Sequence, residues 1–128
     1  MKRQIDVLTS LECRALLNAC SRNAPSGLRN RALIVVLWRA CLRINEALSL
    51  RLKDVSGDAI RVHSGKGDRA RTVGLDPESS AVIDQWTAKR RELGFKPSQP
   101  LFCTLKGKPL LDSYCRHLFK RLAKKAGL

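Results

Sequence analysis

The sequence predicts an α+β domain that is mainly helical, with helices around a small antiparallel β-sheet. Two observations predict it: apolar residues recur at helical spacing in several stretches, and two alternating segments flank a glycine-containing turn. A chain of 128 residues supports one domain with a hydrophobic core and leaves little room for a second. We therefore expect residues 1–128 to form one unit.

The first expected helix begins at a capping box. Thr9 and Glu12 stand three residues apart, so their side chains can each accept a hydrogen bond from a backbone N–H group at the helix start. Apolar side chains then recur at helical spacing, at Cys13, Leu16, Leu17 and Cys20. Residues 23–27 contain a proline and a glycine and predict a turn or loop.

The second helix, expected over residues 28–40, is apolar on nearly all sides. The apolar positions are Leu33, Ile34, Val35, Val36, Leu37, Trp38 and Ala40. A helix without a polar face belongs at the centre of a fold. We expect this helix to hold the core together and a short helix over residues 45–52 to follow it, with Ile44, Ala47 and Leu48 facing inward.

A β-hairpin is predicted over residues 58–75. Its two arms alternate, with Ile60 and Val62 in one and Val73 and Leu75 in the other. The connection contains Gly65 and Gly67, and glycine readily adopts the positive φ angles that a tight turn needs. Lys66 therefore stands near the expected tip.

A third long helix is predicted to start after this hairpin. Asp76 suits the N-cap, Pro77 the first helical position, and Glu78 the acidic first turn. Its apolar positions are Val82, Ile83 and Trp86, and it should end near Gly94.

The last helix is expected over residues 113–126, with Asp112 as its cap and a short strand over residues 101–103 before it. Its apolar positions are Cys115, Leu118, Phe119, Leu122 and Ala126. Another face carries the basic residues Arg116, Lys120 and Lys124. These three residues could contact the phosphates of a polyanion, or they could simply form a solvated face.

The charge of the chain is strongly positive. Twenty-five Lys and Arg residues against 11 Asp and Glu leave a net charge of +14, with a sequence pI near 10.4. A domain this basic attracts polyanions, of which nucleic acid is the commonest, although charge does not separate DNA from RNA. A solubility role or a ribosome-associated protein is the alternative.

The cysteines and histidines do not predict a metal site. The five cysteines are odd in number and contain no C-x-x-C pair, and the chain has only two histidines. We expect free thiols in a reducing compartment. No apolar run approaches the roughly 18 residues of a membrane span, and no secretory signal is evident, so we expect a cytoplasmic protein without a membrane partner.

Two motifs carry a family resemblance. Residues 40–50 read A-C-L-R-I-N-E-A-L-S-L, and residues 65–75 read G-K-G-D-R-A-R-T-V-G-L. In order, separation and expected elements they resemble the catalytic domain of the tyrosine recombinases, the phage-integrase and Xer-like family. The departures are Cys41 where the family usually has glycine, Asn45 where serine or glycine is usual, and Gly74 where proline is usual.

The resemblance implies roles for particular residues. Arg43 corresponds to a catalytic arginine that clamps phosphate oxygens in the transition state, and Lys66 to a lysine that protonates the leaving 5′ oxygen. Glu46, one turn from Arg43, is expected to support the site structurally. Arg69 and Arg71 would contact phosphates or brace the hairpin.

The resemblance also implies what lies outside residues 1–128. No segment here resembles the family's N-terminal core-binding domain. The H-x-x-R motif and the nucleophilic tyrosine have no counterpart either, because His117 does not begin such a motif and Tyr114 precedes the expected position. We expect the N-terminal half of a catalytic domain that needs no metal or nucleotide cofactor and cannot cleave DNA alone.

Double-stranded DNA is the expected partner, together with a second copy of the chain or an intact recombinase that covers apolar surface. Two other functions remain open from the sequence. The chain could be a non-catalytic DNA-binding module, a remnant that modulates an intact recombinase. A basic RNA-associated protein is the third reading.

Overall fold

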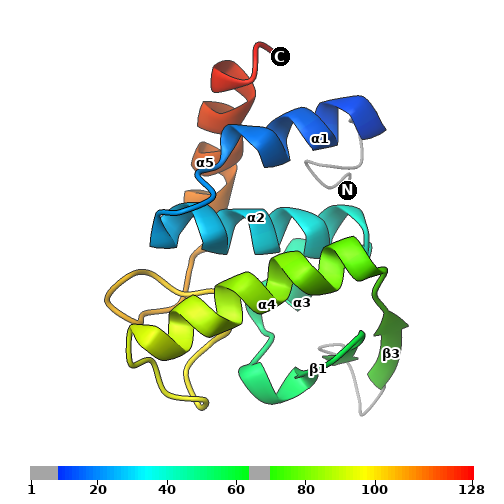
Figure 1. The fold of residues 1–128 in the computed structure, drawn as a ribbon, viewed down its shortest axis with the longest axis vertical. Coiled ribbons are helices and arrows are strands. Elements are labelled where there is room, and N and C mark those ends of the chain that lie inside the picture. The colour runs from blue at the N-terminus through cyan, green and yellow to red at the C-terminus, as the bar shows by residue number, and fades with distance from the viewer. Residues whose placement is uncertain (1–8, 64–69) are drawn as a thin grey trace.

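The computed structural model describes residues 9–63 and 70–128, and it confirms the expected α+β class (Figure 1). Helices surround a three-stranded antiparallel sheet. In chain order the elements are α1 Ser10–Ala19, α2 Pro25–Trp38, α3 Ile44–Leu48, the 3-10 turn η2 Leu52–Asp54, β1 Val55–Ser56, β2 Ala59–His63, β3 Ala70–Gly74, α4 Pro77–Glu92 and α5 Asp112–Lys125.

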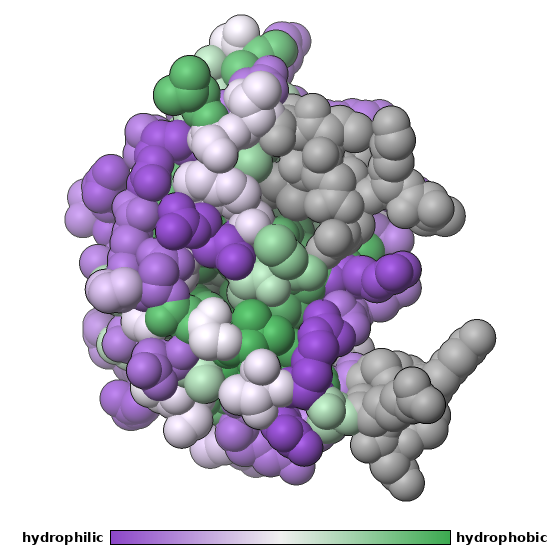
Figure 2. All heavy atoms as spheres, turned by 90° about the vertical axis from the view of Figure 1, so that its right-hand side faces the viewer, coloured by the Kyte–Doolittle hydropathy of each residue, from purple (hydrophilic) through white to green (hydrophobic). Residues whose placement is uncertain are grey.

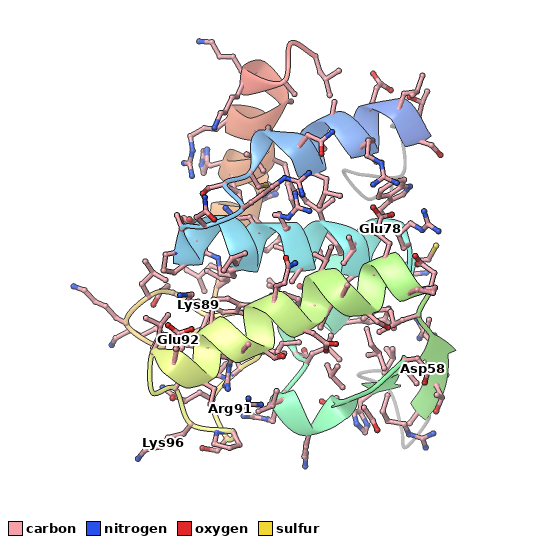
Figure 3. The ribbon with its side chains drawn as sticks, in the orientation of Figure 1. Asp58, Glu78, Lys89, Arg91, Glu92 and Lys96 are labelled. Atoms are coloured by element: carbon pink, nitrogen blue, oxygen red, sulfur yellow. The ribbon has the colours of Figure 1, made fainter. Side chains whose placement is uncertain are left out.

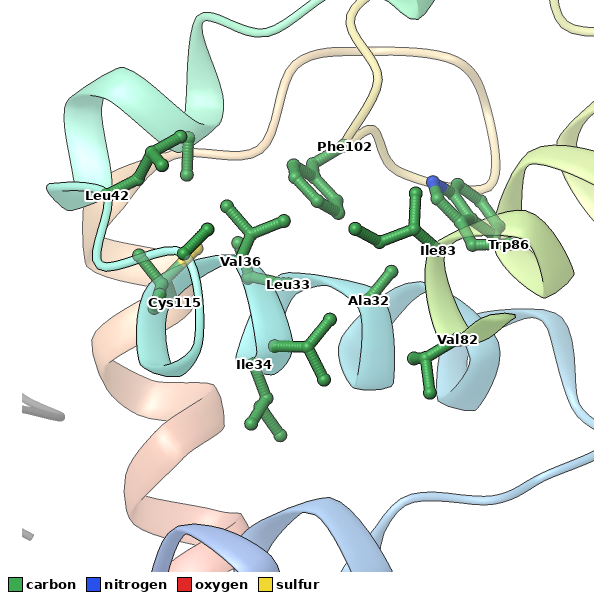
Figure 4. Packing of buried hydrophobic residues seen from close by; sticks show 14 of the residues in the cluster. Ala32, Leu33, Ile34, Val36, Leu42, Val82, Ile83, Trp86, Phe102 and Cys115 are labelled. Carbon is green, nitrogen blue, oxygen red and sulfur yellow. The ribbon is translucent and has the colours of Figure 1, made fainter. Parts of the chain in front are cut away.

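Helix α2 occupies the centre, as its apolar sequence predicts. Every residue from Gly27 to Leu37 is buried, and α2 lies between α1 and α4, both of which it contacts (Figure 1). Figure 4 shows Ile83 of α4 between Phe102 and Trp86, above Ala32 of α2. The largest share of the core therefore lies between α2 and α4.

The start of α2 differs from the expectation. Residues 25–27 were predicted to lie in a turn, but the helix begins at Pro25, whose fixed φ suits the first helical turn. Gly27 is needed there because a Cβ atom would stand 2.3 Å from the Ser21 carbonyl oxygen. The glycine that suggested a turn instead permits the segment after α1, at Ser21, to lie against α2.

The hairpin is confirmed, and the sheet has one strand more than predicted. β2 pairs with β3 so that Ile60 faces Val73 and Val62 faces Arg71. The added strand, β1, pairs with β2 through Val55 and Ile60. Two residues are too short a stretch for an alternating pattern, so the sequence could not reveal β1.

Helix α4 begins as predicted, with the Asp76 carboxylate accepting a hydrogen bond from the Ser79 backbone N–H at 3.3 Å. After α4, the prediction of a strand over residues 101–103 is wrong. Only an isolated bridge between Cys103 and Pro109 forms, and the Leu101 carbonyl oxygen accepts a hydrogen bond from the indole Nε1 of Trp86 at 2.8 Å. The indole N–H of Trp86 thus takes the place that a backbone N–H of a partner strand would have at the Leu101 carbonyl oxygen.

Helices α3 and α5 differ from the expectation at their ends. α3 stops at Leu48 rather than residue 52, because the chain then turns through η2. α5 includes Asp112 as its first residue, so Leu111, not Asp112, occupies the N-cap position. Its buried face is as predicted at Cys115, Leu118, Phe119 and Leu122, while Ala126 is only partly buried.

Four of the cysteines, Cys13, Cys20, Cys103 and Cys115, are buried free thiols. Burial raises the pKa of Cys20 and of Cys115 to about 11, so these thiols are protonated at neutral pH. Within residues 9–63 and 70–128, no three His, Cys, Asp or Glu side chains gather as metal ligands. No helix in the same ranges is long and apolar enough to cross a membrane.

Candidate functional site

The turn between α2 and α3 presents Arg43. Leu42, directly before it, is fully buried, whereas Arg43 is exposed and occupies the N-cap position of α3 with φ −74° and ψ 153°. Among the residues that the structure describes, none forms a hydrogen bond or ion pair with the Arg43 guanidinium. Arg43 therefore has an anchored backbone and an available cationic head.

The backbone conformation of Cys41 is one that glycine adopts more easily. Its φ is 59°, and it is the only described residue other than glycine with a positive φ. That left-handed conformation is unfavourable for a side chain with a Cβ atom and costs about 1 kcal/mol. The turn thus retains the backbone shape that a glycine would adopt, with the Cys41 thiol 3.5 Å from the Trp38 carbonyl oxygen.

Glu46 closes the N-terminus of α3. The backbone N–H of Arg43 donates to Glu46 Oε1 at 2.9 Å, which is half of a capping box. The other half is missing, because a guanidinium has no acceptor to offer the helix. The carboxylate therefore holds the backbone from which the Arg43 side chain extends.

The same carboxylate binds Arg71 of β3. Arg71 Nη1 donates to Oε2 at 2.9 Å and Nη2 donates to Oε1 at 3.1 Å. These hydrogen bonds, with the backbone bond from Arg43, lower the pKa of Glu46 and keep it ionised at neutral pH. Glu46 thereby joins Arg43 and Arg71, two residues that the sequence had singled out separately.

His63, at the end of β2, has a partner that the sequence did not reveal. Its Nε2 lies 3.1 Å from Oδ1 of Asp54, which is buried. The other Asp54 oxygen accepts the Arg51 backbone N–H at 2.9 Å. The two residues meet because η2 folds back beside β2.

The remaining predicted site residues are two in the hairpin connection and three on α5. Lys66 and Arg69 fall outside the described residues. The basic residues of α5 are all exposed along its outer face, at Arg116, Lys120 and Lys124. The structure thus brings Arg43, Glu46 and Arg71 together. Helix α3 packs against α5, but within the described ranges no hydrogen bond or ion pair joins these three residues to Arg116, Lys120 or Lys124.

Tyr114 packs against arginines rather than standing free. Its hydroxyl accepts a hydrogen bond from Nη2 of the buried Arg29 at 3.0 Å. Its ring centroid lies 5.5 Å from the Arg29 guanidinium and 5.9 Å from that of Arg121. Arg29 also donates to the Cys103 carbonyl oxygen at 3.2 Å, so it ties α2 to both α5 and the loop before it.

A polar network borders the end of α2. Two guanidinium groups lie near the Trp38 ring, that of Arg14 at 5.3 Å and that of Arg39 at 5.2 Å from the ring centroid. Arg14 pairs with Glu78 at 2.5 Å, and Figure 3 shows Glu78 at the end of α4 nearest α1. The face on which α2 ends and α4 begins accordingly has an apolar area bordered by hydrophilic side chains (Figure 2).

Known proteins resemble this chain over nearly all its length. The tyrosine recombinase XerD of Ralstonia nicotianae is 30% identical over 125 residues, covering 94% of this chain and 41% of XerD. The crystal structure of XerA recombinase superposes with a TM-score of 0.81 at 28% identity, covering 94% of this chain and 42% of XerA. XerH, solved bound to its difH substrate before cleavage, gives a TM-score of 0.76 at 30% identity, covering 99% of this chain and 38% of XerH.

The chain thus spans less than half the length of these relatives. Its match to the phage integrase family covers residues 6–128. Both motifs fall within that range, and the arginine motif adopts the α2–α3 turn described above. On its sequence and its fold, this chain belongs to the phage integrase family.

Proposed function

We propose that this chain is the DNA-binding part of a site-specific tyrosine recombinase and carries half of its active site. The observation that carries the proposal is Arg43, an exposed guanidinium on a fixed turn within a family match that spans residues 6–128. Residues 1–128 would form a partial catalytic domain. In the intact enzyme a tyrosine outside this range would attack the DNA and form a 3′-phosphotyrosyl link.

Arg43 would act on the phosphate under attack. Negative charge builds on the nonbridging oxygens in that transition state, and a planar guanidinium can bind two of them at once. Lys66 would donate a proton to the departing 5′ oxygen. Neither step requires a metal or nucleotide cofactor.

Other basic residues would position the duplex. The exposed residues of α5 form a cationic face that suits a phosphate backbone, at Arg116, Lys120 and Lys124. Such contacts supply affinity without reading the sequence. The XerH structure supports double-stranded DNA as the partner, because XerH was solved bound to its difH substrate.

A salt titration tests the proposal. We expect the chain to bind a 30-base-pair duplex, with the logarithm of the affinity falling linearly as the logarithm of salt concentration rises. Removing one phosphate contact should lower the slope by about 0.9. Arg43→Ala and Lys120→Ala should each do so, whereas the control Arg91→Ala, exposed at the far end of α4, should leave the slope unchanged.

Incubation with a duplex that carries a recombination site should yield no covalent adduct, because the nucleophile lies outside residues 1–128. An adduct at any residue would refute that part of the proposal. Equal loss of slope in the Arg91 control would mean diffuse charge attraction rather than a site.

A non-catalytic DNA-binding module is the second candidate. The observation in its favour is the basic face of α5, which lies on a different element from Arg43 and could bind DNA without it. It predicts that Arg43→Ala costs one phosphate contact and nothing more. Competition between duplex DNA and structured RNA at matched salt separates both candidates from an RNA-associated protein.

A further inference from the structure

We infer that Arg71 is a positioning residue, which holds Glu46 and through it the backbone of Arg43, rather than a ligand for DNA phosphate. The inference rests on the proposed function, because it assigns Arg71 a task within that site. It links Arg43 of the α2–α3 turn, Glu46 of α3 and Arg71 of β3.

The geometry of the carboxylate carries the first step. Glu46 Oε1 accepts from the Arg43 backbone N–H at 2.9 Å and from Arg71 Nη2 at 3.1 Å, while Oε2 accepts from Arg71 Nη1 at 2.9 Å. One oxygen therefore serves both the turn and the strand. A carboxylate held at two points cannot rotate without breaking one of these bonds, so Arg71 fixes the orientation in which Glu46 meets Arg43.

The charges carry the second step. Both terminal nitrogens of Arg71 are engaged by Glu46, in the bidentate geometry that makes such pairs specific. A phosphate would have to compete with this carboxylate for the two N–H groups that face it, and only the other N–H groups of the guanidinium stay open. The Arg43 guanidinium has no such competitor among the described residues. The Arg43 guanidinium therefore stays available to a phosphate, whereas that of Arg71 is paired with Glu46.

Burial carries the third step. The Glu46 side chain is only 14% exposed, whereas that of Arg71 is 49% exposed. Loss of Arg71 would leave a largely buried carboxylate short of two donors, so the carboxylate would turn toward water and weaken its bond to Arg43. The effect of Arg71 on Arg43 therefore passes through the buried partner.

A second side-chain contact holds the neighbouring strand. His63, the last residue of β2, pairs with Asp54 of η2, as Arg71 of β3 pairs with Glu46 of α3. Each long strand of the sheet is thus tied to the body of the protein near the end that adjoins residues 64–69. The two contacts fix the position of the sheet relative to η2 and α3, and therefore relative to Arg43.

The backbone amide of Arg43 provides a direct readout. In nuclear magnetic resonance spectra its proton should resonate downfield in the wild-type chain, because it bonds to a carboxylate. Arg71→Ala should shift it upfield, and Arg71→Lys, which keeps the charge and one donor, should restore part of the shift. The control is Arg61→Ala, whose side chain on β2 bonds to Thr72 and does not contact Glu46. An Arg43 amide that is unchanged in Arg71→Ala overturns the inference.

DNA binding supplies the second arm. We expect Arg71→Ala to weaken duplex binding about tenfold, as loss of a charge-assisted hydrogen bond to phosphate by Arg43 would, with the salt slope lowered no further than in Arg43→Ala. Arg71→Ala should add nothing in an Arg43→Ala background, because both act on one contact. Additive losses, with a further fall of about 0.9 in slope, would mean that Arg71 contacts phosphate itself and would overturn the inference.

The two arms separate the inference from the proposed function. A wild-type chain without salt-dependent duplex binding would defeat the proposed function, while the amide shift would still decide whether Arg71 positions Arg43. Urea unfolding of each variant identifies any that lose the fold, and Arg71→Lys then carries the test.

Discussion

Two arginines in this fold have opposite surroundings. Arg90, near the end of α4, is 1% exposed, and its Nη2 donates to the carbonyl oxygens of Lys96 at 2.7 Å, Gln99 at 2.7 Å and Pro100 at 3.3 Å. Arg43, in the α2–α3 turn, is exposed, and its guanidinium forms no hydrogen bond or ion pair with any described residue. The first guanidinium organises a loop of its own chain, and the second is available to an anion.

Burial decides whether a guanidinium binds its own chain or stays open to a partner. A guanidinium is tolerated in the interior when hydrogen bonds offset its burial: Arg90 Nη2 bonds to the loop carbonyls, its Nε has no hydrogen-bond partner among the described residues, and burial lowers its pKa. An exposed guanidinium contributes little to stability and keeps its donors for a partner. Substitutions in the α4–loop region should therefore change folding, and those in the turn should change binding.

The largest expected effect is at Trp86. Its side chain is fully buried and its indole N–H bonds to the Leu101 carbonyl oxygen, so Trp86→Ala should lower the free energy of unfolding by about 4 kcal/mol. Urea unfolding measures this loss. Trp86→Phe should lose less, because a ring still fills the site. Arg43→Ala, the counterpart in the turn, should stay within about 0.5 kcal/mol of wild type.

Arg90→Met should lower the free energy of unfolding by about 3 kcal/mol, because three loop carbonyls lose their donor. The matched control is the next residue, since Arg91 is exposed and Arg91→Met should change stability by less than about 0.5 kcal/mol. Equal effects in the two variants would show that burial of the guanidinium does not set the difference.

Cys41→Gly should stabilise the chain. Its φ of 59° is unfavourable for a side chain and acceptable to glycine, so the gain relative to Cys41→Ala should be about 1 kcal/mol. Both variants lose the thiol, and only one loses the Cβ atom. Thermal unfolding that ranks alanine above glycine would contradict the backbone argument.

The smallest effect concerns Glu46, whose pKa is lowered chiefly by Arg71. A lowered folded-state pKa stabilises the fold above the unfolded value of about 4.3, and this contribution is lost as the pH falls through the folded pKa. Because Arg71 is half exposed, the contribution should stay below about 1 kcal/mol. The stability difference between wild type and Glu46→Gln should therefore shrink between pH 6 and pH 3, and a constant difference would argue against the pair.

Much of the fold could be predicted because its signals are local. The Thr9 and Glu12 capping box is formed, with hydrogen bonds of 2.9 and 3.1 Å, and the alternating segments around residues 64–69 pair as a hairpin. The errors fall where a distant segment decides. The start of α2 depends on how closely Gly27 approaches Ser21, and residues 101–103 bond to Trp86 instead of forming a strand.

The candidate site divides in the same way. Arg43, Glu46 and Arg71 could be identified from their motifs, but their joint geometry could not, because 25 residues separate Glu46 from Arg71. The partner of His63 was missed because no local pattern indicates that Asp54 folds back beside β2. Sequence spacing predicts contacts within a helix or hairpin and gives no distance between them.

The sequence by itself determined the helices, the hairpin, the cationic character of the chain and the family to which it belongs. These follow from periodicity, capping residues, composition and motif order, all of which act over a few residues at a time. Only the tertiary structure decided that Arg90 is buried while Arg43 is exposed, and that Glu46 binds both a turn and a strand. Burial and charge pairing depend on which segments pack together, so identical side chains acquire different tasks.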